Sequence, residues 1–201
     1  MELLDDVTVV FSDLAAAKEN LDRARGSPRE VRRNLSRYAE LSQRLTAVMR
    51  RQFSQRTGRK WEASSFPGWT TDTRLLKYLR NQDQHGLQVL ISVEHHQYFS
   101  FSRFFGVAMA DGDELILTSS YVTDHQLLEH DPPGVLWSEA SSSGNGTTAP
   151  LVPLRAEWSY HLVARDETER RLFADASSKD IHVVATSTLT TLSEYTAFFR
   201  A

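Results

Sequence analysis

The chain has 201 residues, of which 40% are hydrophobic and 24% are charged, and it contains no cysteine. These proportions are typical of one globular domain with a sizeable core, and they exclude a disulfide scaffold and any thiolate site. No apolar run approaches the roughly 20 residues that span a bilayer, and the acidic N-terminus lacks the pattern of a secretory signal. We therefore expect a cytoplasmic protein with a single domain over residues 1–201.

The net charge of −3 is unevenly distributed along the chain. Residues 1–80 carry 16 Lys and Arg against 10 Asp and Glu, whereas residues 81–201 carry 7 against 16. The strongest basic segment is 29–60, which contains Arg29, Arg32, Arg33, Arg37, Arg44, Arg50, Arg51, Arg56, Arg59 and Lys60. Such a segment favours an anionic partner, or it forms a solvated helix face that the acidic half of the molecule balances.

Apolar residues at helical spacing predict the first three elements, over about 2–24, 28–55 and 71–85. Ser27, Pro28 and Glu30 form a typical helix start, and Gly86 is a typical left-handed stop after His85. The same spacing predicts two further helices, one over about 153–175 and one from 181 to the C-terminus.

The composition changes between the third and fourth predicted helices. Segments 87–93, 98–109 and 114–122 are rich in β-branched and aromatic residues, with a tight turn at 111–113. They predict a β insertion of three short antiparallel strands over 87–122. Residues 138–150 are rich in Ser, Gly and Thr, which predicts a flexible loop. The expected fold class is mainly α: a bundle of about five helices with a small inserted three-stranded antiparallel element.

The residues with the clearest chemical potential are 80–85, Arg-Asn-Gln-Asp-Gln-His, at the end of the third predicted helix. A guanidinium can hold a phosphate, and an imidazole can transfer a proton near neutral pH. Five residues turn a helix by about 500°, so Arg80 and His85 point about 140° apart, whereas Asn81 and His85 share a face. One copy of the motif is therefore poorly arranged to hold a phosphate with both Arg80 and His85. In the alternative interpretation, both cations are simply helix-end residues near the terminal carbonyls.

The pattern Arg80-Asn81-x-x-x-His85 resembles the motif of the HEPN superfamily, a set of small helical bundles that includes many RNases of toxin–antitoxin, phage-defence and RNA-processing systems. The resemblance implies a HEPN-like bundle that forms a homodimer, with two motifs facing one RNA phosphodiester. It implies that His85 acts as general base or acid, that Arg80 stabilises transition-state charge, and that Asn81 orients His85 or a phosphate oxygen. It further suggests an antitoxin or a nucleotidyltransferase-type partner.

Two other functions stay open: a catalytically silent HEPN-like interaction or sensor module, and an RNA-binding protein that uses segment 29–60 without cleavage. A metal site is a weaker idea. His95 and His96 are adjacent on a predicted strand and face opposite sides, so they do not chelate a metal together, although Glu94 and His96 could share a face. We expect neither a cofactor nor a metal.

Overall fold

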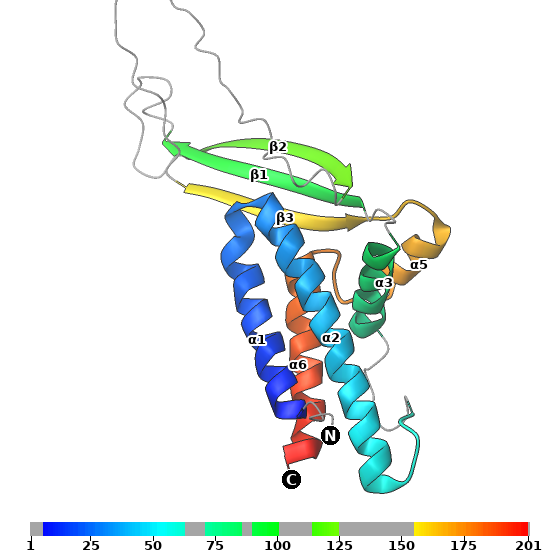
Figure 1. Ribbon diagram of the computed structural model, residues 1–201. Coiled ribbons are helices and arrows are strands. Elements are labelled where there is room, and N and C mark those ends of the chain that lie inside the picture. Colours follow the sequence, from blue (N-terminus) through cyan, green and yellow to red (C-terminus); the bar gives the residue numbers. More distant parts are fainter. Residues whose placement is uncertain (1–5, 63–70, 86–89, 101–113, 125–154, 201) are drawn as a thin grey trace, which may run out of the picture.

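A computed structural model of the chain describes residues 6–62, 71–85, 90–100, 114–124 and 155–200 (Figure 1). These residues form five α-helices, one 3₁₀ turn and three strands. In chain order they are α1 (Val7–Arg23), η1 (Ala24–Gly26), α2 (Pro28–Thr57), α3 (Asp72–Gln84), β1 (Leu90–Ser100), β2 (Glu114–Asp124), β3 (Arg155–Val163), α5 (Glu167–Ala174) and α6 (Ile181–Arg200). The fold is thus mainly helical with a small antiparallel sheet, as the sequence predicts. Among the described helices, none combines the length and the hydrophobicity that a transmembrane span requires.

Helices α1, α2 and α6 lie side by side and enclose most of the core (Figure 1). Their buried side chains recur at steps of three and four, which aligns them on one face of each helix. Tyr38 of α2 is fully buried, and its hydroxyl donates a hydrogen bond of 2.7 Å to the Ala185 carbonyl of α6. This bond satisfies two polar groups that the apolar interior would otherwise leave unpaired.

The ends of α2 follow local rules. Pro28 occupies the first helical position, as predicted, although the Ser27 side chain makes no capping hydrogen bond. The helix extends to Thr57, two residues beyond the predicted end, where Gly58 adopts a left-handed conformation with φ 66°. The Gly58 N–H donates to the Ser54 carbonyl at 2.9 Å, which satisfies one of the last helix carbonyls.

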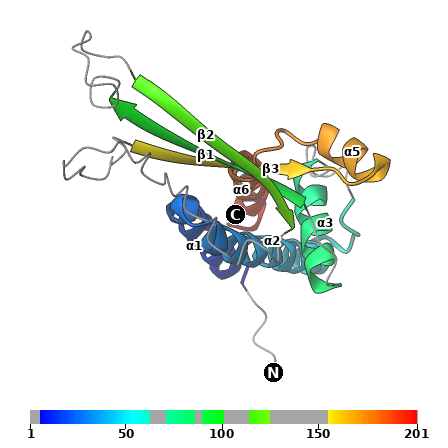
Figure 2. The ribbon, with the colours of Figure 1, turned by 90° about the horizontal axis from the view of Figure 1, so that it is seen from above.

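The sheet has the strand order β2-β1-β3 and lies across one end of the bundle (Figures 1 and 2). Both pairings are antiparallel, with Val93 of β1 opposite Tyr160 of β3. Ile91, Val93, Tyr160 and Leu162 share one face of the sheet and are buried. The Tyr160 hydroxyl donates to the Arg25 carbonyl at 2.9 Å, so the sheet is fastened to the turn between α1 and α2.

One prediction next to the β region is wrong. The helix expected over 153–175 begins only at Glu167, because residues 155–163 form β3. Trp158 and Leu162 are four residues apart, and this spacing places two side chains on one face of a strand as well as of a helix. Within the predicted insertion 87–122 the structure describes two strands, β1 and β2, each 11 residues long, and most of the predicted strand 98–109 lies outside the described residues. The turn at 111–113 and the loop at 138–150 lie outside the described residues.

Two polar clamps hold α3 against the segment that contains α5. At its start, the buried Asp72 carboxylate accepts hydrogen bonds from the Ser177 N–H at 2.9 Å and the Ser177 hydroxyl at 2.7 Å. Near its middle, the Tyr78 hydroxyl donates to the buried Glu169 carboxylate, which also accepts from the Arg165 backbone N–H at 2.7 Å and the Arg165 Nε at 2.9 Å. These clamps fix the helix that carries the Arg-Asn-x-x-x-His motif.

Candidate functional site at the end of α3

The structure places the three motif residues where the helix prediction expects them. Arg80 and Asn81 lie in the last turns of α3 and are half-buried. His85 follows the last helical residue and caps the helix, since its N–H donates to the Asn81 carbonyl at 3.1 Å. The His85 side chain is exposed. It is therefore accessible to a ligand.

Asn81 orients Arg80 within the chain. The Arg80 Nη1 donates to the Asn81 Oδ1 at 3.2 Å, while the Arg80 Nε is buried and has no hydrogen-bond partner in the described residues. The resemblance implies that Asn81 orients His85 or a phosphate oxygen; among the described groups, the Asn81 side chain forms no hydrogen bond with the His85 ring and instead accepts one from Arg80. The guanidinium is thus held in position by its neighbour.

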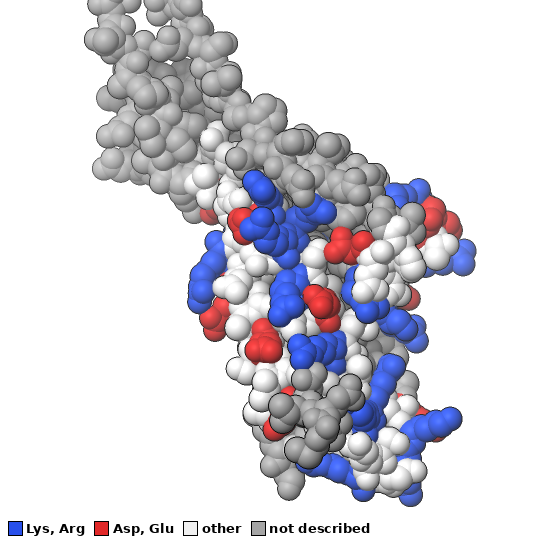
Figure 3. All heavy atoms as spheres, in the orientation of Figure 1, with Lys and Arg blue, Asp and Glu red and all other residues white. Residues whose placement is uncertain are grey.

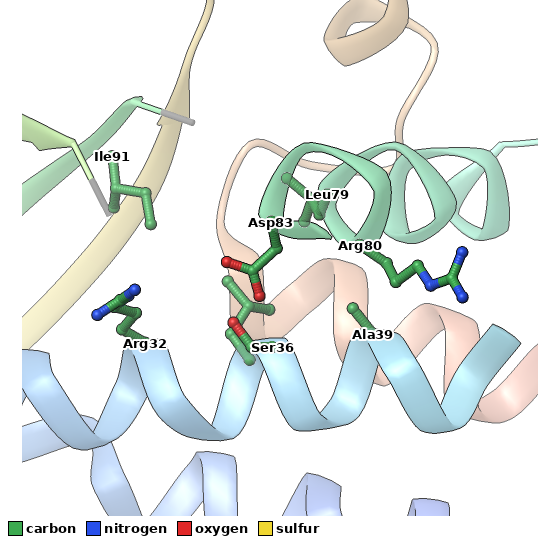
Figure 4. Close-up of a pocket in the computed structure, with 8 residues that line it drawn as sticks. Arg32, Ser36, Ala39, Leu79, Arg80, Asp83 and Ile91 are labelled. Carbon is green, nitrogen blue, oxygen red and sulfur yellow. The ribbon is translucent and has the colours of Figure 1, made fainter. Parts of the chain in front are cut away.

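One copy of the chain does not bring Arg80 and His85 into one pocket. Arg80 lines a small cavity between α3 and α2 with Ser36, Asp83 and Ile91 among others, and its guanidinium is directed along α2, away from Asp83 (Figure 4). The volume of this cavity is about 30 Å³, which is the space of a single water molecule and not of a nucleotide. His85 does not line it. The divergence of about 140° that helical geometry predicts is consistent with this arrangement.

A wider groove adjoins this cavity, and the sequence analysis did not foresee it. The groove has a volume of about 310 Å³. It is lined by Arg29, Arg32, Arg33 and Ser36 of α2 and by Asp83 of α3. Its arginines belong to the predicted basic segment, and Asp83 lies inside the motif. The sequence offered no signal that these residues, about 50 positions apart, would face one another.

The basic segment divides into parts with different roles. Arg33, Arg37, Arg44 and Arg51 are exposed and recur at steps of four and seven, so they follow one side of α2. Figure 3 shows many Lys and Arg side chains on this face of the molecule, with Asp and Glu side chains between them. Arg56, in contrast, donates from Nη2 to the Phe199 carbonyl at 3.0 Å and lies over the Phe199 ring. Arg56 therefore fastens α6 to α2.

The histidine pair on β1 behaves as the strand geometry predicts. The His95 ring stacks on Trp158 with 3.9 Å between ring centroids, whereas the His96 Nε2 lies 3.5 Å from the Glu94 carboxylate on the other face. Burial, together with the charge of His96, holds the pKa of His95 below its ordinary value. The described residues contain no group of three or more potential metal ligands.

A buried histidine of α6 was not singled out by the sequence analysis. His182 is 2% exposed, and its Nδ1 lies 3.2 Å from the Asp22 carboxylate of α1, which also pairs with the buried Lys18 at 2.6 Å. Burial and the nearby charge of Arg25 lower the pKa of His182 despite the Asp22 contact. Burial thus favours the neutral form of the His182 ring, and its contact with Asp22 joins α6 to α1.

No family model matches the chain, and neither a curated protein nor a solved structure does. The function must therefore be argued from the motif and its surroundings alone.

Proposed function

We propose that this protein is a metal-independent endoribonuclease of HEPN type, in which the Arg80, Asn81 and His85 of two copies form one composite site. The observation that carries the proposal is the exposed His85 at the end of α3, little more than one turn after an Arg80 that Asn81 holds in place. A role as a toxin or phage-defence effector, with an antitoxin or nucleotidyltransferase-type partner, rests on the resemblance of the motif.

A second copy would supply the group that one chain does not bring to the same cavity. Arg80 lines the small cavity between α3 and α2, His85 does not line it, and the His85 side chain is exposed at the helix end. A two-fold axis near the C-terminal ends of α3 would bring two histidines and two arginines together. Such an interface is self-complementary, as in most homodimers.

In the proposed reaction, one His85 removes the proton from a ribose 2′-OH, and the resulting oxygen attacks the adjacent phosphorus. The bond between phosphorus and the 5′-oxygen breaks, and the second His85, in its protonated form, donates a proton to the leaving oxygen. The products are a 2′,3′-cyclic phosphate and a 5′-hydroxyl. Arg80 stabilises the added negative charge in the transition state. DNA lacks the 2′-OH and is not cleaved.

The test is RNA cleavage in the presence of EDTA. We expect His85→Ala to lower the cleavage rate by about 100-fold or more, the usual contribution of a general acid or base. Gln84→Ala is the matched control, since Gln84 is the exposed neighbour on the same helix end, and its rate should be unchanged. Undiminished cleavage by His85→Ala would remove His85 from the chemistry and overturn the proposal.

A second candidate function, RNA binding without cleavage, is favoured by the surroundings of Arg80. Its Nη1 donates to Asn81 and its Nε is buried, so two of its nitrogen atoms are poorly placed to donate to a phosphate. A catalytically silent HEPN-like module has the same basis. Under both alternatives the wild-type protein leaves RNA intact. If the protein binds RNA without cleaving it, its affinity for RNA should also be salt-sensitive and should survive Arg80→Ala.

A further inference from the structure

The groove between the start of α2 and the end of α3 has no role in the chemistry described above. Three arginines line it, Arg29, Arg32 and Arg33, against one carboxylate, that of Asp83. Arg29 and Arg33 are exposed, and Arg32 is half-buried. Glu30 pairs with Arg33 at 3.0 Å and offsets part of this charge. The lining remains positive and therefore favours an anion.

The size of the groove limits the ligand. A volume of about 310 Å³ is at the lower end of the range for ligand clefts, which suits one nucleotide unit rather than a duplex. Guanidinium groups pair with phosphate through two parallel hydrogen bonds. Ser36 adds a hydroxyl to the same wall.

The groove continues into a longer row of cations. Arg33 belongs both to the groove and to the exposed row that continues through Arg37, Arg44 and Arg51 on α2. From Arg33 to Arg51 the helix rises by about 27 Å. A row of this length fits a ligand with regularly repeated anionic groups, such as a nucleic-acid strand, better than a single small anion.

We infer that this groove, beside the Arg-Asn-x-x-x-His motif, binds the phosphodiester backbone of single-stranded RNA through Arg29, Arg32 and Arg33. The inference rests on the proposed function in taking RNA as the ligand. The Asp83 carboxylate lines the same groove and repels a bound phosphate. Removing the charge of Asp83 should therefore strengthen RNA binding, whereas removing charge from the arginines should weaken it.

The experiment measures fluorescence anisotropy of a labelled 12-nucleotide oligouridylate, in a His85→Ala background so that cleavage does not interfere. Arg29→Gln with Arg33→Gln should raise the Kd about tenfold. The salt dependence of log K should fall by about 0.7 for each lost phosphate contact, as for single strands. Asp83→Asn should lower the Kd by two- to fivefold, a gain that misfolding would not produce.

The matched control is Arg170→Gln with Arg171→Gln on α5. It removes the same charge from two exposed arginines, of which Arg170, like Arg33, pairs with a glutamate three residues earlier. This control should change the Kd by less than twofold. Equal losses in the two double variants would show that only net charge matters and would overturn the inference, as would undetectable RNA binding.

An oligoglutamate peptide of equal charge serves as the competing ligand. If it binds as tightly as the RNA and depends on the same arginines, the groove is a site for acidic proteins and the inference fails. Cleavage is measured separately in the His85-containing protein. Groove-dependent binding without any cleavage would leave this inference standing and overturn the proposed nuclease activity, so the two failures are distinguishable.

Discussion

The clamp at Glu169 gives the most direct test of how the fold positions α3. The Glu169 side chain is 1% exposed, and its carboxylate accepts hydrogen bonds from Tyr78 of α3 and from the backbone and side chain of Arg165. Burial raises the pKa of Glu169, but the hydrogen bonds from Arg165 and Tyr78 outweigh burial and hold it below its ordinary value. Burial and the bond to Glu169 raise the pKa of Tyr78 to about 12. The carboxylate is therefore the charged centre of the clamp.

Glu169→Ala should be strongly destabilising. Removing one partner of a fully buried ion pair costs about 3–5 kcal/mol. The Arg165 side chain is 31% exposed and recovers part of its hydration, so we expect a smaller loss, about 2–3 kcal/mol in the free energy of unfolding. Cleavage should also fall, because α3 loses a contact that positions the motif.

The assay is urea denaturation, with Glu167→Ala as the control. Glu167 lies on the same helix and forms ion pairs with Arg170 and Arg171, but its side chain is 56% exposed. Its loss should cost less than about 1 kcal/mol. If Glu169→Ala costs no more than Glu167→Ala, the clamp does not hold α3 and this reasoning is refuted. The Glu169 contribution should also depend on pH: fully present above its ordinary pKa of 4.5, it is lost as the pH falls through the lower folded value.

Two further predictions concern the rest of the fold. The pKa of His182 is lowered from 6.5 in the folded state, so unfolding takes up a proton and the free energy of unfolding should decrease as the pH falls below 6.5. The difference in unfolding free energy between wild type and His182→Gln, measured from pH 8 to pH 5, should show this decrease. A difference that does not change with pH would contradict the prediction. Gly58→Ala should lower the free energy of unfolding by about 1 kcal/mol, because an L-residue is strained at φ 66° even though no atom lies within 4 Å of the added Cβ. Gly26→Ala, at a position without positive φ, should leave this free energy unchanged or raise it slightly in the same urea titration. Equal effects of the two substitutions would exclude backbone strain as the cause.

The sequence predicted the long helices because their apolar spacing coincides with their buried faces. Leu14 and Leu21 of α1, like Leu41 and Leu45 of α2, lie on the predicted stripes and are buried. Strand β3 was missed because the Trp158–Leu162 spacing of four satisfies both a helix and a strand. Because this local pattern fits both a helix and a strand, only the pairing of β3 with β1 in the folded chain decides between them.

The candidate site was predictable only in part. Helix geometry alone predicts that Arg80 and His85 diverge, and in the structure His85 does not line the cavity that Arg80 lines. The groove depends on the approach of α3 to α2, which places Asp83 opposite Arg32. The bond between Arg80 and Asn81 depends on rotamers. Neither feature has a signature in the order of residues, so both emerge only from the tertiary structure.

The central claim is that two copies of the chain bring their motifs together, and the absence of cysteine makes this directly measurable. A spin label at Gln84→Cys, beside His85, should give one short and narrow distance between subunits by pulsed dipolar spectroscopy. The same label at Glu19→Cys on α1, which lies across the bundle from α3 (Figure 2), should give a longer one. No dipolar signal from Gln84→Cys, or a distance longer than that from Glu19→Cys, would contradict the composite site.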